Sequence, residues 1–401
     1  MNNQRQVIVQ KYGGSSVATL EKLESIAKRV VDKHSQGYGV VVVVSAMGKK
    51  TDELISLAKQ ITDNPPAREL DMLLSTGERT TMALLSIAIQ KYGVESISFT
   101  GSQSGIITTD SHSHARIISV RPYRIQDELE RNKVVIVAGF QGTSYKNEIT
   151  TLGRGGSDMT AIALAGALSA QACEIYSDVD GVYSADPKTV LDAQKLDEIS
   201  SSEMLEIAQH GAKVLHDEAI LYAHRHQIAL YAKKSHCDQS SGTFIRPDGW
   251  PESALKSAEI KPKAIVTAQR ILWLSVKTAD VQLYLDQLQR GSLFKIMALA
   301  ASGNHVEAIL DIWNCTDIEG LKAQLSCEAD HPILRSDVKN VTVVGQDIGR
   351  LTDWVQKLRK SLGDEHIPIL SMFTEPNDIT FVVDAEQCAK ASNILHRFVS
   401  E

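Results

Sequence analysis

A run of five valines at positions 40–44 constrains the fold of this chain more than any other stretch of its sequence. The run is a fully apolar strand that ends at Ser45. Similar strands alternate along the chain with helical runs, with strands expected at 134–138 and 174–177 and helices at about 17–31, 71–92 and 159–168. This order predicts an α/β fold with a mostly parallel sheet. Ligands bind at the carboxyl edge of such sheets, where Ser45 lies, although a serine that closes a strand is more often structural.

Composition limits the functions and locations that are open to the chain. Of its 401 residues, 43% are hydrophobic and 23% charged, so it can bury a full core and form two or three domains. The net charge of -7 argues against nucleic acid as a partner, because phosphate binding requires a basic face. No apolar segment resembles a signal peptide or could span a membrane, and the five cysteines are scattered without a C-x-x-C pair. We therefore expect a cytoplasmic protein with no membrane partner.

A cluster of proline and glycine at 246–264 predicts a domain boundary. Beyond it, two shorter segments each show the order strand, helix, strand, strand, helix. Strands are expected at 271–277, 295–300 and 307–313 in the first segment and at 341–344, 369–373 and 379–383 in the second. One large α/β domain at 1–262 is thus expected to precede two small α+β units at 263–336 and 337–401.

The stretch VIVQKYGGSSV at 7–17 places Lys11 between a strand and a glycine turn. Gly13 and Gly14 permit a tight turn, and Ser15 could cap the helix that follows. Strand, turn and helix start would form a phosphate cradle to which Lys11 adds a full positive charge. It is not a Walker loop, in which the lysine follows the glycines. An ordinary turn beside an exposed lysine is the alternative.

Two further stretches carry side chains that suit a free amino acid. STGERTTMALLSIAI places Glu78 inside an apolar helix, where it could hold an ammonium group or lie on a solvated face. In TTLGRGGSD, glycines let the backbone approach a ligand while Arg154 offers a fork for a carboxylate. The alternative is a plain capping turn with Ser157 or Asp158 at the N-cap.

Metal binding finds little support in the sequence. The stretch IYSDVDGVYSADPK carries three aspartates but lacks the closing glutamate of a calcium loop. The histidine pairs His112 with His114 and His224 with His226 have no cysteine partner at ligand spacing. We expect surface or core histidines and no protein metal site.

Taken together, the motifs closely resemble those of the aspartokinases of the amino-acid kinase family, in order and spacing over about residues 5–250. The resemblance is carried by KYGGSSV, SAMGKKTDE, STGER, FTGSQSGI, VAGFQG, TTLGRGGSD, SDVDGVYSADPK and GAKVLH. It implies a mostly parallel sheet sandwiched by helices. It also implies ATP-dependent phosphorylation of the β-carboxylate of L-aspartate to 4-phospho-L-aspartate, the first step toward lysine, threonine and methionine.

The resemblance also implies a role for individual residues. Lys11 would steady the transferring phosphoryl group and Asp158 would orient Lys11. The aspartate site would consist of Arg29, Thr51, Glu78, Arg154, Gly155, Gly156 and Ser157. The nucleotide site would consist of Lys11, Gly13, Gly14, Ser45, Ser177, Asp178, Tyr183, Ser184, Asp186, Lys188 and Lys213. Mg²⁺ would be held mainly by the ATP phosphates, and no general base is needed because the aspartate carboxylate is already ionised.

Two alternatives remain at this point. Acetylglutamate and uridylate kinases share the phosphate cradle but not the pair STGER and TTLGRGGSD. An amino-acid sensor without catalysis would have no need for Lys11, Asp158 and Lys213 together. No G-x-G-x-x-G follows the kinase part, so we expect a monofunctional enzyme without a fused homoserine dehydrogenase.

The tail resembles paired ACT domains, with the strand near 264–267 expected to complete the second. The turns where such domains hold an effector read VKTADVQLYL and VGQDIGRLTDW, and the first lacks glycine and proline altogether. We therefore expect weak or absent inhibition by lysine and threonine, and a tail that serves to form a homodimer or higher homo-oligomer. The alternative is a retained effector site in the second unit, at 345–349 and SMFTEPND.

Overall fold

The computed structural model describes residues 5–212, 214–237, 241–250, 260–268, 270–278, 295–312, 315, 318–326 and 332–400. The chain divides into two compact units. Unit 1 comprises Met1–Val182, Leu196–Ser201 and Val214–Pro251, and unit 2 comprises Tyr183–Lys195, Ser202–Lys213 and Glu252–Glu401. Unit 2 thus takes in two segments that precede the proline- and glycine-rich stretch, while the domain limits at 262 and 336 stay predictions. None of the described helices is long and apolar enough to cross a bilayer.

Unit 1 is built around an eight-stranded sheet in the order β10-β12-β11-β9-β1-β2-β6-β3. Every neighbouring pair in it is parallel except β11 with β12. Its strands are β1 (Val7–Tyr12), β2 (Gly39–Val44), β3 (Ser96–Phe99), β6 (Val134–Ala138), β9 (Ala172–Ser177), β10 (Glu198–Ser200), β11 (Leu230–Lys234) and β12 (Thr243–Arg246). The predicted mostly parallel α/β sheet is confirmed.

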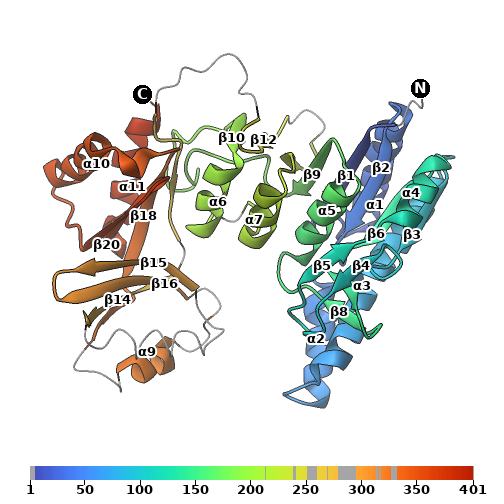
Figure 1. The fold of residues 1–401 in the computed structure, drawn as a ribbon, viewed down its shortest axis with the longest axis horizontal. Coiled ribbons are helices and arrows are strands. Elements are labelled where there is room, and N and C mark those ends of the chain that lie inside the picture. Colours follow the sequence, from blue (N-terminus) through green and yellow to red (C-terminus); the bar gives the residue numbers. More distant parts are fainter. Residues whose placement is uncertain are drawn as a thin grey trace. The chain divides into compact units, whose positions relative to one another are not determined.

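Helices cover both faces of this sheet (Figure 1). The helices of unit 1 are α1 (Leu20–Ser35), α2 (Lys50–Ile61), α3 (Ala67–Gln90), α4 (Tyr123–Glu130), α5 (Gly156–Ala167) and α7 (Asp217–Arg225). Val40, Val42 and Val44 pack with α1 and α3 in one apolar core. Because side chains alternate along a strand, Val41 and Val43 point to the opposite face, where α5 lies. Burial on both faces explains why β2 contains no polar residue.

A second sheet of unit 1 has the order β5-β4-β7-β8. It consists of β4 (Ile106–Thr108), β5 (Ile117–Val120), β7 (Gln141–Ser144) and β8 (Ile149–Thr151). Asp71 of α3 is fully buried and fixes this sheet to the helix. Its carboxylate accepts hydrogen bonds from Thr151 Oγ1 at 2.6 Å and from the Ser113 N–H at 3.1 Å, and it pairs with His112 at 2.9 Å. The strand β8 leads directly into the loop of Arg154.

Unit 2 contains two antiparallel four-stranded sheets, in the orders β13-β18-β20-β19 and β15-β16-β14-β17. The strands are β13 (Ala264–Val266), β14 (Ile271–Lys277), β15 (Lys295–Ser302), β16 (His305–Asp311), β17 (Ile333–Arg335), β18 (Val338–Val344), β19 (Ser371–Glu375) and β20 (Asp378–Asp384). The helices are α6 (Ser201–Gln209, all but its first residue in unit 2), α9 (Ile318–Ser326), α10 (Thr352–Asp364) and α11 (Cys388–Ser400), with 3₁₀ turns η2 (Ile348–Arg350) and η3 (Ala385–Gln387).

The sheets of unit 2 confirm the predicted small α+β character of the tail. Helices α10 and α11 pack on the β13-β18-β20-β19 sheet through an apolar cluster that includes Phe381 and Leu358 (Figure 1). The two sheets share a second cluster that contains Trp273, Phe373 and Val382. Trp313, the end of one predicted strand, lies outside the described residues.

One local prediction is wrong. The first helix begins at Leu20 rather than near Val17, and its N-cap is Thr19, whose hydroxyl accepts the Lys22 N–H at 3.3 Å. Ser15 therefore does not cap the helix. The glycine turn after β1 lies several residues before the helix start, so the dipole of α1 adds little charge to it, because that effect is confined to the first turn.

Candidate active site

The carboxyl ends of four adjacent parallel strands meet at one edge of the main sheet. Tyr12 at the end of β1 pairs with Val44 of β2 and with Tyr176 of β9, and Val44 pairs in turn with Ala138 of β6. The residues that follow these strand ends are Gly13, Ser45, Ser177 and Gly139. Glycine and serine turns thus lie at the edge where open α/β sheets bind ligands.

Lys11 and Asp158 form an ion pair at this edge. Lys11 lies on β1 one residue before its end, and Asp158 lies in the first turn of α5. The Lys11 Nζ to Asp158 Oδ1 distance is 2.6 Å, and the side chains are only 11% and 13% exposed. The start of a helix also favours a negative charge at Asp158. The ammonium is thus held at the sheet edge by a partner that is itself fixed by the helix.

The turn after β1 lies close to the turn after β2. The Gly48 N–H donates to Gly14 O at 3.0 Å, and a Cβ added at Gly14 would lie 3.0 Å from Ala46 O. A Cβ added at Gly13 would lie 3.4 Å from the Lys11 ammonium nitrogen. A side chain at position 14 would therefore have to move the turn after β2 by a few tenths of an ångström.

Glu78 of α3 points at the same turn. It is 3% exposed, and its Oε1 accepts the Ala46 N–H at 3.1 Å. Its Oε2 is buried and has no hydrogen-bond partner among the described residues. Burial raises the pKa of Glu78 to about 7, against the opposing effect of backbone hydrogen bonds. The alternative of a solvated helix face is wrong.

Gly77 explains how Glu78 comes so near the end of β2. A Cβ added at Gly77 would lie 2.8 Å from the Ala46 Cβ, closer than real side chains approach. The absence of a side chain lets α3 pack directly against the turn. Thr51, which is half-buried in the first turn of α2, follows that same turn in the sequence.

The loop before α5 carries Arg154 and two glycines. Gly155 is the N-cap, with φ of 70° in the left-handed region, so the alternative with Ser157 or Asp158 at the N-cap is wrong. A Cβ added at Gly155 would lie 2.4 Å from the His216 ring, and one added at Gly156 would lie 2.9 Å from Leu152.

Arg154 itself is exposed and forms no ion pair with a described residue. Ser157 is almost buried, and its hydroxyl would lie 2.7 Å from a Cβ added at Gly139. The loop thus presents a guanidinium to solvent above a closely packed glycine turn.

Arg29 lies elsewhere than the other residues predicted for the aspartate site. Its guanidinium donates to Ser235 O and lies over the Tyr176 ring, 5.1 Å from the ring centre. The Ser235 hydroxyl in turn donates to Ser177 O at 2.9 Å. Arg29 therefore contacts residues at the end of β9, next to Ser177, which was predicted for the nucleotide.

The residues predicted for the nucleotide fall into both units. Gly13, Gly14, Ser45, Ser177 and the exposed Asp178 belong to unit 1, whereas Tyr183, Ser184, Asp186 and Lys188 belong to unit 2. Within unit 2 the Ser184 hydroxyl is buried and lies 2.8 Å from His396 Nε2. Asp186 and Lys188 are exposed. Lys213 lies outside the described residues.

Sequence reasoning missed two residues that shape this edge. Phe140 adopts φ of 69°, which is rare for a bulky residue, and its N–H donates to Thr160 Oγ1 at 3.1 Å. His216 packs on Gly155. The motifs VAGFQG and GAKVLH contain them, but a left-handed phenylalanine leaves no compositional signal.

The histidine pairs have separate partners. His112 pairs with the buried Asp71, while His226 stacks on Tyr222 at 4.1 Å between ring centres. His224 Nδ1 lies 2.9 Å from the Ser201 hydroxyl. These contacts give His112, His224 and His226 structural roles.

Comparison with known proteins places this geometry in a family. The model described as amino acid kinase family matches residues 6–232. An aspartokinase of Mycobacterium tuberculosis strain H37Rv is 54% identical over 240 residues, which cover 60% of this chain and 57% of that protein. The aspartokinase of Geobacillus stearothermophilus is 38% identical over 392 residues, which cover 97% of this chain and 96% of the relative.

A solved structure shows the same fold. E. coli aspartokinase III matches with a TM-score of 0.79 at 23% identity, over 99% of this chain and 100% of that chain. The match to the M. tuberculosis relative, by contrast, spans little more than half of that protein's length.

Replacing Glu78 by glutamine should change how stability depends on pH. The folded-state pKa of Glu78, about 7, lies above the ordinary value of 4.5, so the stability that this group contributes is present below pH 4.5 and is lost as the pH rises through 7. Glu78→Gln removes that loss. We therefore expect the difference in free energy of unfolding, Glu78→Gln minus the unsubstituted chain, to rise by up to about 3 kcal/mol from pH 5 to pH 8. Urea unfolding without ligands at both pH values measures this difference.

The exposed Glu53 of α2 supplies the matched control, and Glu53→Gln should show no such change. An equal stability difference for Glu78→Gln at both pH values would contradict the burial argument.

Proposed function

Since the chain belongs to the amino acid kinase family and, within it, to the aspartokinases, we propose that it transfers the γ-phosphoryl group of ATP to the β-carboxylate of L-aspartate. The products are 4-phospho-L-aspartate and ADP. The observation that carries the proposal is the Lys11–Asp158 pair at the sheet edge together with the unpartnered Oε2 of the buried Glu78. The E. coli structure was obtained with aspartate and ADP, which supports the same ligands here.

Lys11 supplies positive charge beside the transferring phosphoryl group, whose oxygens carry negative charge in the transition state. Phosphoryl transfer depends on positioning and on electrostatic stabilisation more than on covalent help. Asp158 keeps the ammonium in place before the substrates arrive, so little reorganisation is needed during the reaction. The β-carboxylate nucleophile is already ionised at neutral pH. No general base is therefore assigned.

Glu78 and Arg154 suit the two charged groups of a free α-amino acid. Glu78 Oε2 accepts the ammonium of aspartate, and that positive charge lowers the pKa of Glu78 so that the carboxylate ionises on binding. Arg154 offers two parallel N–H donors to the α-carboxylate. Thr51, Gly155, Gly156 and Ser157 line the same region in this proposal. Arg29 of α1 lies over Tyr176 near the end of β9, and in this proposal it acts there rather than beside Glu78.

The nucleotide is proposed to meet Lys11, the turn at Gly13 and Gly14, Ser45 and the residues after β9, Ser177 and Asp178. The donor set fits a polyphosphate, because an ammonium and two glycine turns lie together at this edge. Mg²⁺ is held mainly by the phosphates, since Asp158 is already paired with Lys11. The roles of Tyr183, Ser184, Asp186, Lys188 and Lys213 stay predictions from the resemblance.

The cell compartment and assembly complete the proposal: a cytoplasmic biosynthetic enzyme that forms a homodimer through its tail. β15 is an edge strand, and its Ile296 and Leu299 are 38% and 47% exposed. An open strand edge with apolar side chains favours pairing with a second copy. Light scattering of the full chain measures the mass that decides this point.

A hydroxylamine trap for acyl phosphates tests the substrate. Aspartate, glutamate, acetylglutamate and UMP are each incubated with ATP and Mg²⁺. We expect a strong ATP-dependent signal with aspartate alone. Acetylglutamate and UMP lack the free ammonium group that Glu78 accepts, and glutamate carries its side-chain carboxylate one methylene farther from that group. For UMP, whose product is no acyl phosphate, ADP release is followed instead. Comparable turnover of acetylglutamate or UMP would identify another kinase of the family, and no turnover of any would favour the amino-acid sensor.

Lys11→Ala should lower turnover with aspartate by about 100-fold or more, because it removes a preorganised cation at the transferring phosphoryl group. The substitution also leaves Asp158 as an uncompensated, largely buried charge. The double variant Lys11→Ala with Asp158→Asn relieves that charge and separates loss of stability from loss of turnover. Steady-state rates provide the measurement.

Lys91→Ala is the matched control, since Lys91 forms an exposed ion pair with Glu24. It should leave turnover unchanged. Near-normal turnover of Lys11→Ala would show that Lys11 is an ordinary strand residue.

Feedback by lysine and threonine is proposed to be weak or absent. In the second tail unit, the N–H groups at the turn between β18 and α10 are already used. The Gly345 N–H donates to Asn377 O at 2.9 Å, and the Asp347 N–H donates to Asn377 Oδ1 at 3.0 Å. The Gly349 N–H donates to Pro376 O at 3.1 Å. An effector carboxylate would have to displace these bonds. Most of the first unit's turn, 279–285, lies outside the described residues.

We expect lysine, threonine or both at millimolar level to reduce the rate less than about fivefold at an aspartate concentration near KM, which corresponds to a coupling below about 1 kcal/mol. Steady-state rates with each effector measure this. Strong inhibition by either amino acid or by the pair would show that the tail still binds an effector.

A further inference from the structure

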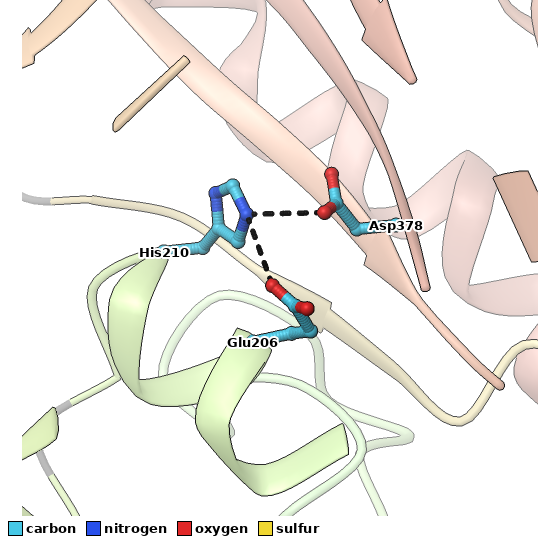
Figure 2. A group of neighbouring side chains, drawn as sticks. All are labelled: Glu206, His210 and Asp378. Carbon is cyan, nitrogen blue, oxygen red and sulfur yellow. Dashed lines mark ion pairs between the residues drawn. The ribbon is translucent and has the colours of Figure 1, made fainter. Parts of the chain in front are cut away.

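Unit 2 contains a cluster of one imidazole and two carboxylates that the proposed kinase reaction does not use. Glu206 and His210 lie one turn apart on and just after α6, and Asp378 is the first residue of β20. Figure 2 shows both carboxylates approaching the same ring nitrogen of His210. His210 Nε2 lies 3.4 Å from Asp378 Oδ2 and 3.9 Å from Glu206 Oε2. His210 and Asp378 are buried, at 5% and 2% exposure.

The orientation of one amide begins a chain of hydrogen bonds that leads to His210. The Ala268 N–H donates to Asn340 Oδ1 at 2.8 Å, so the other end of the Asn340 side chain must be its NH₂ group. That group donates to Thr342 Oγ1 at 3.1 Å. Thr342 therefore accepts one hydrogen bond and has one hydrogen of its own to donate.

The second part of the chain shows where that hydrogen goes. The Thr380 hydroxyl donates to Asp378 Oδ1 at 3.2 Å, which uses its only hydrogen. With that hydrogen on Asp378, Thr380 accepts from Thr342, 2.8 Å away. Thr342 then offers a lone pair to His210 Nδ1, at 3.3 Å. In this arrangement of hydrogens His210 carries a hydrogen on Nδ1, and the nitrogen that faces the two carboxylates is Nε2.

In this arrangement of hydrogens, a positive charge beside Nε2 is favourable. With Nδ1 protonated, a neutral imidazole would direct the Nε2 lone pair at two carboxylates. Asp378 Oδ2 is buried and accepts no hydrogen bond from the described residues. A buried carboxylate oxygen without a partner is costly. Either a proton on Nε2 or a bound cation removes this repulsion.

The distances favour a bound cation over a proton. A charge-assisted N–H···O bond is about 2.7–2.9 Å long, well below the 3.4 Å from His210 to Asp378. Two ligands of a tetrahedral Zn²⁺, each about 2.0–2.1 Å from the metal, lie about 3.3 Å apart. The three ligand atoms all lie within 4.8 Å of one another. Glu206, whose side chain is 22% exposed, has room to move the remaining distance.

We propose that Glu206, His210 and Asp378 bind a divalent transition metal of the Zn²⁺ class. Imidazole nitrogen with carboxylate oxygen is a donor set that suits Zn²⁺. Three protein ligands leave a fourth position for water. The Nδ1–H of His210 on Thr342, and the Thr380 hydroxyl on Asp378, hold the ligands in orientation as outer partners do in zinc sites. The metal joins α6 to the sheet of β18 and β20 within unit 2.

Zinc titration of the full chain tests the proposal. The purified protein is freed of metal with a chelator and titrated with Zn²⁺ by calorimetry, and Co²⁺ serves as a spectroscopic probe of the donor set. We expect one Zn²⁺ per chain and visible Co²⁺ bands of reduced coordination. His210→Gln and Asp378→Asn should each weaken Zn²⁺ binding by at least about tenfold.

Two further variants make the result specific. Glu206→Gln changes a ligand whose side chain is 22% exposed. It provides the test if His210→Gln or Asp378→Asn does not fold, and circular dichroism shows whether each variant is folded. His224→Gln is the matched control, because His224 Nδ1 lies 3.6 Å from a carboxylate oxygen of Asp248 outside the cluster. It should bind Zn²⁺ as the unsubstituted chain does. The proposal would be overturned if Zn²⁺ did not bind stoichiometrically. It would also be overturned if His210→Gln and Glu206→Gln bound Zn²⁺ as tightly as the unsubstituted chain does.

Discussion

The ion pair between Lys11 and Asp158 determines how the rest of unit 1 has to be built. Each side chain is largely removed from water, so removing one partner would leave the other as a buried charge without compensation. Lys11 reaches the edge from β1, a strand at the centre of the sheet, and Asp158 reaches it from the first turn of α5, which packs on that strand. The small residues of α5 let this helix lie close to β1 and β2. The Lys11 ammonium group is therefore held, largely buried, at the edge where the strands end.

Close backbone packing then decides which other groups reach that edge. Gly77 lets α3 contact the turn after β2, which carries Glu78 into a buried position beside Ala46. Gly14 brings the turn after β1 onto the same segment. A side chain at either position would push the elements apart and expose the carboxylate. The raised pKa of Glu78 thus follows from a packing feature, and it keeps the group ready for a cation from outside the protein.

The sequence predicted the four adjacent strands β9, β1, β2 and β6 of the main sheet, but not β3, β10, β11 or β12. The strand β2 is buried on both faces and consists of Gly39 and five valines, so its own sequence is enough to predict it. Helix ends are harder to predict. Thr19 caps α1 with its hydroxyl and Gly155 begins α5 in a left-handed conformation, whereas composition alone also allowed Ser15 and Ser157 as caps. The burial of Glu78 depended on Gly77 meeting a turn far away in sequence. Likewise, the assignment of 183–195 to unit 2 rests on contacts such as that of Ser184 with His396, 212 positions apart.

Glu78 and Asp378 illustrate one physical rule with two outcomes. In each, one carboxylate oxygen is oriented by the protein, by the Ala46 N–H or by the Thr380 hydroxyl, and the other is buried without a hydrogen bond. Such an oxygen favours a positive partner from outside the described residues, and its neighbours decide which partner fits. The ammonium proposed beside Glu78 has three hydrogens to donate, which suits a carboxylate oxygen that lacks a donor. The metal proposed beside Asp378 can in addition accept a lone pair from Nε2 of His210, which an ammonium cannot do. In these two proposals, the difference between a substrate position and a metal position thus lies in the single ring nitrogen beside Asp378.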